Sequence, residues 1–434
     1  RARARFRLRA SEDALQAAVS AVHIFLAHGL GCLWSVAAAA ATFHGCRPLL
    51  PAAPRDPERY RRRVWALGLA LLCVNNFLQD GLDDAVSSMF PSSLPAWLVH
   101  GPLRGPVKYF GPLLAFRFLC LRLLSYSLEV GEGGWGAAEA EARSARAFWL
   151  YVSYSPTYLH GPHVPFKDWM RQRQAERAGL GKKGHGDGDA RRRPPVRGAW
   201  REAASMAALS GAAGAALTTV YMPTVLWFML KSRVLAVDPP QFGPAEHFLY
   251  GHLFLLFTFM QSHVIFGCSR AAALLDGRAV GHDTPVSHLR TSVSLSHHWN
   301  WFHQTWRNFF LRHVFVPAGG GGGGLVRTVA FSVLLHGFRW EWAFWGIVNL
   351  VVLSLERALR RSFGWYQRPN FLVRAVNQAL VMHLQLVLFG GFATRRGGGL
   401  DWSGHRAFLG LNLAFCLLNA VRLGPAPDGR PGFW

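Results

Sequence analysis

Long apolar blocks alternate along the chain with shorter polar segments, most of which carry arginine or lysine. A helix needs roughly 20 residues to cross the hydrocarbon core of a bilayer, which is about 30 Å thick. Blocks of about that length run over residues 14–43, 203–231, 247–268, 325–355, 371–392 and 406–423. Shorter or broken blocks lie at 64–78, 109–128 and 147–166. Because no stretch alternates like a barrel strand, the pattern predicts an all-α, polytopic helical membrane protein.

Composition and charge agree with this prediction. Of the 434 residues, 51% are hydrophobic and 16% are charged, against about 25% charged residues in typical soluble domains. The net charge of +23 is carried between the apolar blocks, at 1–9, 55–63 and 167–201. Basic loops of this kind usually face the cytoplasm and attract anionic lipids, so we expect no nucleic-acid partner.

The segment 167–201 is the most basic connection, with 11 Lys and Arg against 4 Asp and Glu. Glycine, proline and charge dominate it, and no apolar periodicity is visible. We therefore expect a flexible cytosolic loop. No cleaved signal peptide is apparent, because the first apolar block is longer than the core of such a peptide. The chain begins with Arg1 rather than methionine, which leaves open what precedes it.

Two apolar segments contain residues that a simple membrane helix would avoid. Segment 110–129 carries Arg117, Arg122 and Glu129, which either face a protein interior or reach toward an interface. Segment 148–169 contains three prolines, which exclude a regular membrane helix. It is either a re-entrant, cavity-lining segment or an interfacial belt of aromatic residues.

Segment 296–324 mixes tryptophan, histidine and arginine and is too polar to span a membrane. It ends in Pro317 and six consecutive glycines, which we expect to stop any helix and to form a pliable connection. Four of its residues are histidines, at positions 297, 298, 303 and 313. Since no acidic or cysteine ligand lies among them, and the six cysteines form no regular spacing, no metal site is predicted.

The apolar helix that follows carries a single imidazole, His336, which lies 33 residues after His303. Desolvation favours a neutral imidazole, which can take a proton from a hydroxyl or amine. General-base catalysis of this kind contributes about 10² to 10⁴ in rate. His303 could orient an acceptor, stabilise developing charge or hold a water. The competing interpretation of His336 is hydrogen-bonded packing. A serine nucleophile is less favoured, because no Gly-x-Ser-x-Gly elbow occurs.

The two histidine segments, 299–320 and "LLHGFRWEWAFWG", resemble the membrane-bound O-acyltransferase (MBOAT) superfamily. In that superfamily a polar, Trp-rich segment with Asn, Asp or His precedes an apolar helix with a near-invariant histidine. His303 and His336 stand at these two positions. The resemblance implies one membrane domain over 1–434, an MBOAT fold with about 9 to 11 transmembrane helices, and re-entrant segments.

Two upstream blocks are similar to the branch of that superfamily that holds the fungal glycerol uptake (Gup) proteins and Hedgehog acyltransferase. Segment 115–129 resembles the Arg-x-x-Ser-(Phe/Tyr)-x-x-(Asp/Glu) stretch of the branch, and 151–169 resembles its Tyr-x-x-Tyr-x-Pro segment. Position 303 is histidine here, as is expected for Gup-like proteins. Hedgehog acyltransferase, in contrast, has aspartate at this position. Leu335, Ala318 and His313 depart from the usual residues and leave the acceptor undetermined.

The resemblance implies an endoplasmic reticulum enzyme that moves a long-chain acyl group from acyl-CoA to a hydroxyl acceptor. The acceptor would be a lipid or a glycosylphosphatidylinositol (GPI) anchor intermediate. His336 would be the base and His303 its partner, and no further cofactor is implied. The candidate substrate-binding residues are Trp299, Trp306, Arg312 and Trp340. The alternatives are a protein palmitoyltransferase and a non-enzymatic glycerol transporter or regulator. A transporter should show repeated halves, and no internal repeat is visible.

Overall fold

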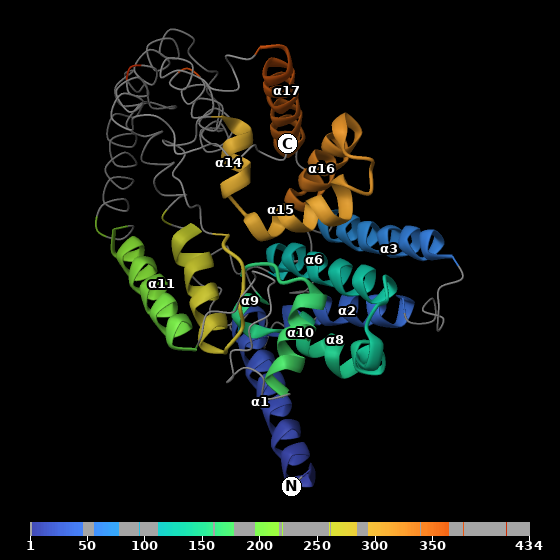
Figure 1. The fold of residues 1–434 in the computed structure, drawn as a ribbon, viewed down its shortest axis with the longest axis vertical. Coiled ribbons are helices and arrows are strands. Elements are labelled where there is room, and N and C mark those ends of the chain that lie inside the picture. Colours follow the sequence, from blue (N-terminus) through green and yellow to red (C-terminus); the bar gives the residue numbers. More distant parts are fainter. Residues whose placement is uncertain are drawn as a thin grey trace. The chain divides into compact units, whose positions relative to one another are not determined.

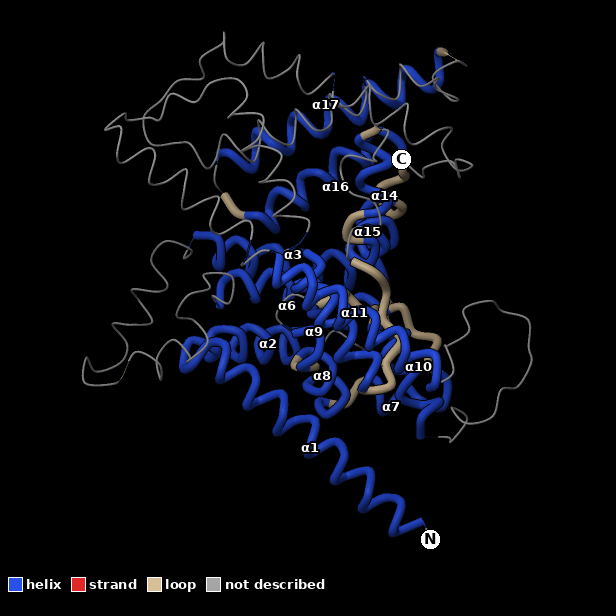
Figure 2. Tube along the Cα trace, turned by 90° about the vertical axis from the view of Figure 1, so that its left-hand side faces the viewer, coloured by secondary structure: helices blue, strands red, loops and turns tan. Residues whose placement is uncertain are grey.

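In the computed structural model, the described part of the chain consists of eight segments and five single positions, 95, 219, 260, 376 and 414. The segments are residues 2–46, 56–77, 112–158, 161–177, 196–216, 262–283, 294–338 and 340–363. Within them every regular element is a helix (Figure 2). The predicted all-α class is therefore confirmed for this part of the chain.

The contacts divide the chain into two units. Unit 1 consists of Arg1–Ala203, Ala272–Gly281 and Leu334–Phe338. Unit 2 consists of Ala204–Ala271, His282–Val333 and Arg339–Trp434. The single membrane domain over 1–434 stays a prediction.

Unit 1 is built around α6, which spans Pro112–Gly131. Figure 1 shows α6 between α2 and α3, and it also contacts α8, α9 and α10. The helices around it are α1 (Ala2–His28), α2 (Cys32–Cys46), α3 (Pro57–Phe77), α7 (Glu139–Ala142), α8 (Ala145–Val152), α9 (Ser155–Tyr158) and α10 (Phe166–Arg177). The short 3₁₀ turns Gly29–Gly31 and Gly136–Ala138 connect some of them.

Small residues let α3 and α6 approach closely. A Cβ atom at Gly68 would lie 2.5 Å from the side chain of Leu124. The Cys120 thiol donates to the Gly68 carbonyl at 3.7 Å, and the Tyr60 hydroxyl donates to the Ser127 carbonyl at 2.7 Å. Close approach of this kind is typical of helices that pack within lipid, where apolar burial alone does not hold them together.

The charges of α6 face the protein interior, which decides between the two interpretations of segment 110–129. Arg122 is 4% exposed and donates to the Val152 carbonyl at 3.1 Å and to Thr157 Oγ1 at 2.8 Å. Glu129 is 0% exposed. It accepts from Ser125 Oγ at 2.9 Å and from the Lys167 amide at 2.6 Å. These bonds offset the cost of burying the charges.

The proline-rich segment 148–169 is broken, as its prolines predict. It consists of the end of α8, the single turn α9, a non-helical stretch at 161–165 and the start of α10. The Tyr151 hydroxyl crosses this break and donates to the Val164 carbonyl at 2.7 Å. The three prolines therefore mark a break in the helical structure that the Tyr151 hydrogen bond spans.

The prediction of a flexible loop over 167–201 is wrong at both of its ends. Residues 167–177 belong to α10, and residues 196–201 begin α11, which spans Val196–Ala216. Arg173 explains why α10 is ordered: its side chain is 4% exposed, pairs with Asp13 of α1 and lies over the ring of Trp169. Tertiary contacts thus outweigh a composition typical of loops. Residues 178–195 lie outside the described part.

Unit 2 contains α14 (Leu295–Trp301), α15 (Gln304–Phe310), the π-helix η9 (Leu311–Phe315), most of α16 (Gly321–His336) and α17 (Trp340–Ser362). A hydrophobic core of Leu295, Leu325 and Leu353 joins α14, α16 and α17. Two further close contacts in this unit use glycine. A Cβ at Gly267 would lie 2.3 Å from Ser210, and one at Gly346 would lie 2.3 Å from Val333.

The run of six glycines is only partly the pliable connection that we expected. It does end the preceding helix: the Gly320 amide donates to the Phe315 carbonyl at 3.0 Å, and Gly320 has φ +63°. The last four glycines, however, form the first turn of α16. A Cβ at Gly324 would lie 2.9 Å from both the Phe315 carbonyl oxygen and its ring. Glycine is therefore required for packing here, which a count of helix breakers does not reveal.

Among the described helices, one is long and apolar enough to cross a membrane, residues Trp342–Ser362 of α17. Only 28% of its most apolar window is buried. Its exposed face carries Phe344, Ile347, Val351 and Leu355 at helical spacing, which is typical of a surface that faces lipid. The predicted spans 371–392 and 406–423 lie outside the described residues, apart from single positions.

Candidate active site

His303 lies at the junction between α14 and α15, where it occupies the N-cap position of α15. Its backbone is in the left-handed region, with φ 49° and ψ 50°. Among the residues that the structure describes, it is the one non-glycine residue with positive φ. A non-glycine residue in a sparsely populated conformation costs about 1–3 kcal/mol and persists only where its surroundings impose it. Such residues concentrate at active sites and ligand-binding sites.

The imidazole of His303 is held among aromatic rings. It stacks on Trp306, with ring centroids 5.0 Å apart and an interplanar angle of 21°. Its other neighbours are Phe266, edge-on at 4.9 Å, and Phe302, at 3.8 Å. The Trp299 ring lies 6.0 Å from Phe302. We call these five residues the aromatic cluster; it brings together three of the predicted site residues, Trp299, His303 and Trp306.

Trp299 is fixed from α17. Its Nε1 donates to Asn349 Oδ1 at 3.0 Å, and its ring meets that of Trp345 edge-on at 5.7 Å. Asn349 is itself anchored, because its side-chain amide donates to the Trp345 carbonyl at 2.8 Å. The position of this indole is therefore set by two residues of α17.

Two buried carboxylates that sequence reasoning missed hold the N-termini of α14 and α15. Glu356 of α17 accepts from the amides of Leu295 and Ser296, at 2.6 and 3.1 Å. Asp283 is 1% exposed and accepts from the Thr305 amide at 2.8 Å and from Thr305 Oγ1 at 2.5 Å. Neither carboxylate is close in sequence to the helix that it caps, so no local motif could have revealed them.

Burial and a neighbouring arginine both act on the imidazole of His297. This residue lies outside the predicted membrane spans, and its pKa is lowered from the usual value by burial and then by the nearby Arg360 guanidinium. Arg360 donates to Ser294 Oγ at 3.0 Å and to Ser296 Oγ at 2.7 Å. The neutral form of His297 is therefore the one that the fold favours.

His336 is the last residue of α16, where it is partly buried and belongs to unit 1. The turn around it is fixed by two contacts from α3: Asn76 Nδ2 donates to the Leu334 carbonyl at 2.6 Å, and the Phe77 ring packs on Phe338 at 4.9 Å. The Arg117 guanidinium of α6 acts electrostatically on the imidazole.

The two remaining candidates are placed differently. Arg312 is exposed on η9. Trp340 is the first residue of α17, and its side chain lies outside the described part. His303 belongs to unit 2 and His336 to unit 1, so the predicted pairing of the two histidines stays a prediction. No group of three or more His, Cys, Asp or Glu that could hold a metal occurs among the described residues.

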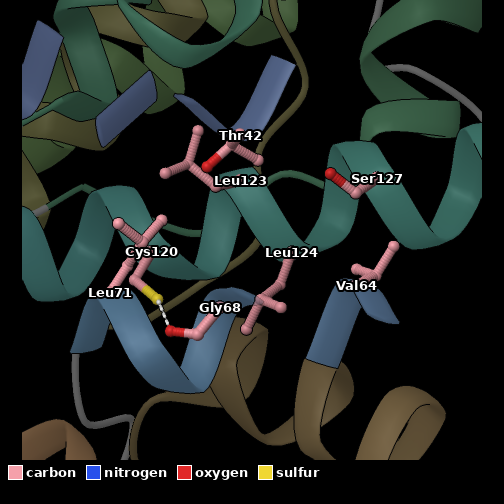
Figure 3. Close-up of a pocket in the computed structure, with 8 residues that line it drawn as sticks. All are labelled: Thr42, Val64, Gly68, Leu71, Cys120, Leu123, Leu124 and Ser127. Carbon is pink, nitrogen blue, oxygen red and sulfur yellow. Dashed lines mark hydrogen bonds between the residues drawn. The ribbon is translucent and has the colours of Figure 1, made fainter. Parts of the chain in front are cut away.

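A small pocket in unit 1 lies between α2, α3 and α6 (Figure 3). It is lined by Thr42, Val64, Gly68, Leu71, Cys120, Leu123, Leu124 and Ser127. The thiol of Cys120 is turned to the Gly68 carbonyl, and the other lining side chains are aliphatic or hydroxyl groups. None of the predicted site residues lines this pocket.

Comparison with known proteins matches residues 85–392 to the family described as MBOAT, membrane-bound O-acyltransferase family. The matched range contains both candidate histidines and both upstream blocks. A curated relative, the "Protein-cysteine N-palmitoyltransferase HHAT" of Mus musculus, is 23% identical over 303 residues. That alignment covers 63% of this chain and 56% of the relative, so the chain spans little more than half of the relative's length. The resemblance inferred from the histidine segments is confirmed.

Proposed function

Because the chain belongs to the membrane-bound O-acyltransferase family, we propose that it transfers a long-chain acyl group from acyl-CoA to a hydroxyl group of a membrane lipid or GPI-anchor intermediate. We place this reaction at the endoplasmic reticulum membrane, with a polytopic chain of about 9 to 11 transmembrane helices. The structural observation that carries the proposal is His303, an imidazole held among aromatic rings on a strained backbone within the matched range.

The proposed chemistry assigns a separate role to each histidine. The imidazole of His336 takes the proton of the acceptor hydroxyl, whose oxygen then attacks the thioester carbonyl carbon. The carbon–sulfur bond breaks, the proton passes to the CoA sulfur, and the products are an ester and free CoA. His303 places the acceptor or donates a hydrogen bond to the carbonyl oxygen as negative charge develops on it.

The remaining candidate residues are assigned to the two ends of acyl-CoA, its acyl chain and its CoA phosphates. The indoles of Trp299, Trp306 and Trp340 offer apolar walls for an acyl chain. Arg312, exposed on η9, offers a cation for the CoA phosphates. No metal and no further cofactor enters this scheme, since the base and the leaving group account for the single proton transferred.

A second acceptor class is favoured by one observation, the similarity to the mouse N-palmitoyltransferase. In that case the acceptor is a protein, and the nucleophile that His336 deprotonates is an amine or a hydroxyl of that protein. The histidine at position 303 favours the lipid acceptor, because Hedgehog acyltransferase is expected to carry aspartate there.

The proposal is tested by acyl transfer from radiolabelled palmitoyl-CoA in membranes that contain the wild type, His336→Ala or His44→Ala. His44 is an exposed histidine of α2 and serves as the matched control. We expect His336→Ala to lower the rate by about 10²- to 10⁴-fold and His44→Ala to leave it unchanged. Equal rates for all three would exclude His336 as the base. Lipid extraction then separates the acceptors: label in the lipid fraction supports the first proposal, and label in protein supports the second.

A further inference from the structure

The N-terminus of α15 lacks the side-chain cap that a helix normally has. The first amides of a helix have no carbonyl partner within it, and Ser, Thr, Asp or Asn at the N-cap usually accepts from one of them. Here the N-cap residue is His303, whose side chain makes no such bond. Its carbonyl does accept from the Arg307 amide at 2.9 Å, so the helix begins directly after it.

Asp283 supplies the acceptor that the N-cap residue does not. Its Oδ1 takes the hydrogen bond of the Thr305 amide, the second residue of α15, which is the amide that an N-cap side chain would reach. Its Oδ2 takes the Thr305 hydroxyl. The carboxylate is almost completely buried, although it lies 22 residues away along the chain. A buried carboxylate is tolerated only where such bonds offset its desolvation.

The imidazole of His303 contacts aromatic rings and does not cap the helix. Because Asp283 satisfies the helix terminus, the histidine ring turns to Trp306 and Phe266 instead of folding back onto the backbone. The neighbouring helix α14, in contrast, has a side-chain N-cap. Its N-cap, Ser294, accepts from the His297 amide at 3.1 Å in the usual way, and Glu356 adds to that cap.

We propose that Asp283 is a positioning residue for His303, which holds the histidine backbone in its left-handed conformation by capping α15 in place of the missing N-cap side chain. The inference rests on the proposed function, because it assigns Asp283 to the same site. When the carboxylate is removed, the first turn of α15 frays and His303 relaxes to a common backbone conformation. Its imidazole then leaves the stack on Trp306.

The experiment is a double-mutant cycle of Asp283→Ala and His303→Ala, with palmitoyl-CoA transfer as the activity. We expect Asp283→Ala to lower kcat about 10- to 100-fold with little change in KM for palmitoyl-CoA, since only the placement of a catalytic group is altered. In the His303→Ala background, Asp283→Ala should have no further effect. Asp283→Asn should restore most of the activity, because its amide oxygen can still accept from the Thr305 amide.

The matched control is Glu129→Ala, which removes a buried carboxylate that accepts from the start of α10 in unit 1. It should leave the activity per folded molecule unchanged in both the wild-type and the His303→Ala backgrounds. If Asp283→Ala multiplies with His303→Ala, the positioning role is overturned. If Asp283→Ala does not fold, the cycle is run with Thr305→Val, which removes only the hydroxyl donor to Asp283. Thr305→Val should then lower kcat in the wild-type background and not in His303→Ala, and a multiplied effect overturns the positioning role.

A second readout does not depend on activity. Hydrogen–deuterium exchange in detergent should rise over residues 303–310 in Asp283→Ala and stay unchanged there in Glu129→Ala. Unchanged exchange over 303–310 in Asp283→Ala overturns the inference. A wild type that transfers no acyl group overturns the proposed function instead, and the exchange result still decides the role of Asp283.

Discussion

The helices α10 and α15 begin in the same way but in different surroundings. Each starts with a backbone amide that donates to a buried carboxylate far away along the chain, Glu129 for α10 and Asp283 for α15. At α10 the carboxylate is also bonded to Ser125, and the surrounding rings of Tyr126, Tyr151 and Trp169 pack into a dense core. At α15 the residue before the helix is a histidine in the left-handed conformation.

The comparison teaches that a buried charge in an apolar segment is weak evidence for chemistry. Arg122 and Glu129 stand in apolar sequence as conspicuously as His336 does, yet their hydrogen bonds join α6 to the segments that pack around it. The two upstream blocks that carry the family resemblance meet through these bonds. They form the framework of unit 1, whereas His303 has a strained backbone of the kind that is concentrated at functional sites.

The largest effect on stability is expected at the start of α10, where Glu129 accepts from the backbone. Glu129→Ala leaves the half-buried Lys167 amide and the buried Ser125 hydroxyl without this acceptor and should lower the free energy of unfolding by roughly 2–4 kcal/mol. Glu129→Gln should cost less, because its amide oxygen can still accept. Unfolding in detergent measures the loss. A specific fall in activity per folded molecule, as in His303→Ala, would contradict the division between framework and site.

A smaller effect is expected where the chain turns after α15. Gly324→Ala places a Cβ against the Phe315 carbonyl and ring and should destabilise the protein by about 1–3 kcal/mol. The matched control is Gly322→Ala in the same helical turn, where a Cβ meets nothing within 4 Å. That variant should stabilise slightly, since alanine loses less entropy in a helix. Shifts of the same sign in the two thermal unfolding midpoints would show that packing on Phe315 is unimportant.

The smallest effect concerns pH and the neighbouring helix α14. Because the folded state lowers the pKa of His297, the unfolded chain takes up a proton there first as the pH falls through about 6.5. The stabilisation of the folded state by a neutral His297 is therefore present above about pH 6.5 and is lost as the pH falls below that value. In His297→Gln, the unfolding midpoint should fall less than in the wild type between about pH 7.5 and pH 5.5. An identical pH dependence in both proteins would exclude His297 as a contributor.

Several features of the fold and the site could be predicted from local sequence. The all-α class followed from long apolar blocks, and the break at 148–169 followed from its three prolines. Trp299, His303 and Trp306 lie in one short segment that the family resemblance singled out, and the structure places them in one aromatic cluster. Where composition alone was used, at 167–177 and 196–201, the prediction of a loop was wrong. The contacts of Arg173 with Asp13 and Trp169 are invisible to composition.

By itself, the sequence determined the helical class, the helix break at the prolines, the family, and the two histidines that are candidates for the chemistry. The tertiary structure decided that the charges of α6 belong to a framework, that part of the glycine run is helical, and that Asp283 and Glu356 cap the helices beside His303. The physical reason is the separation along the chain of the residues that interact. Helix periodicity and proline act over a few residues, whereas a carboxylate 22 or 61 residues away meets its amide only after the chain has folded.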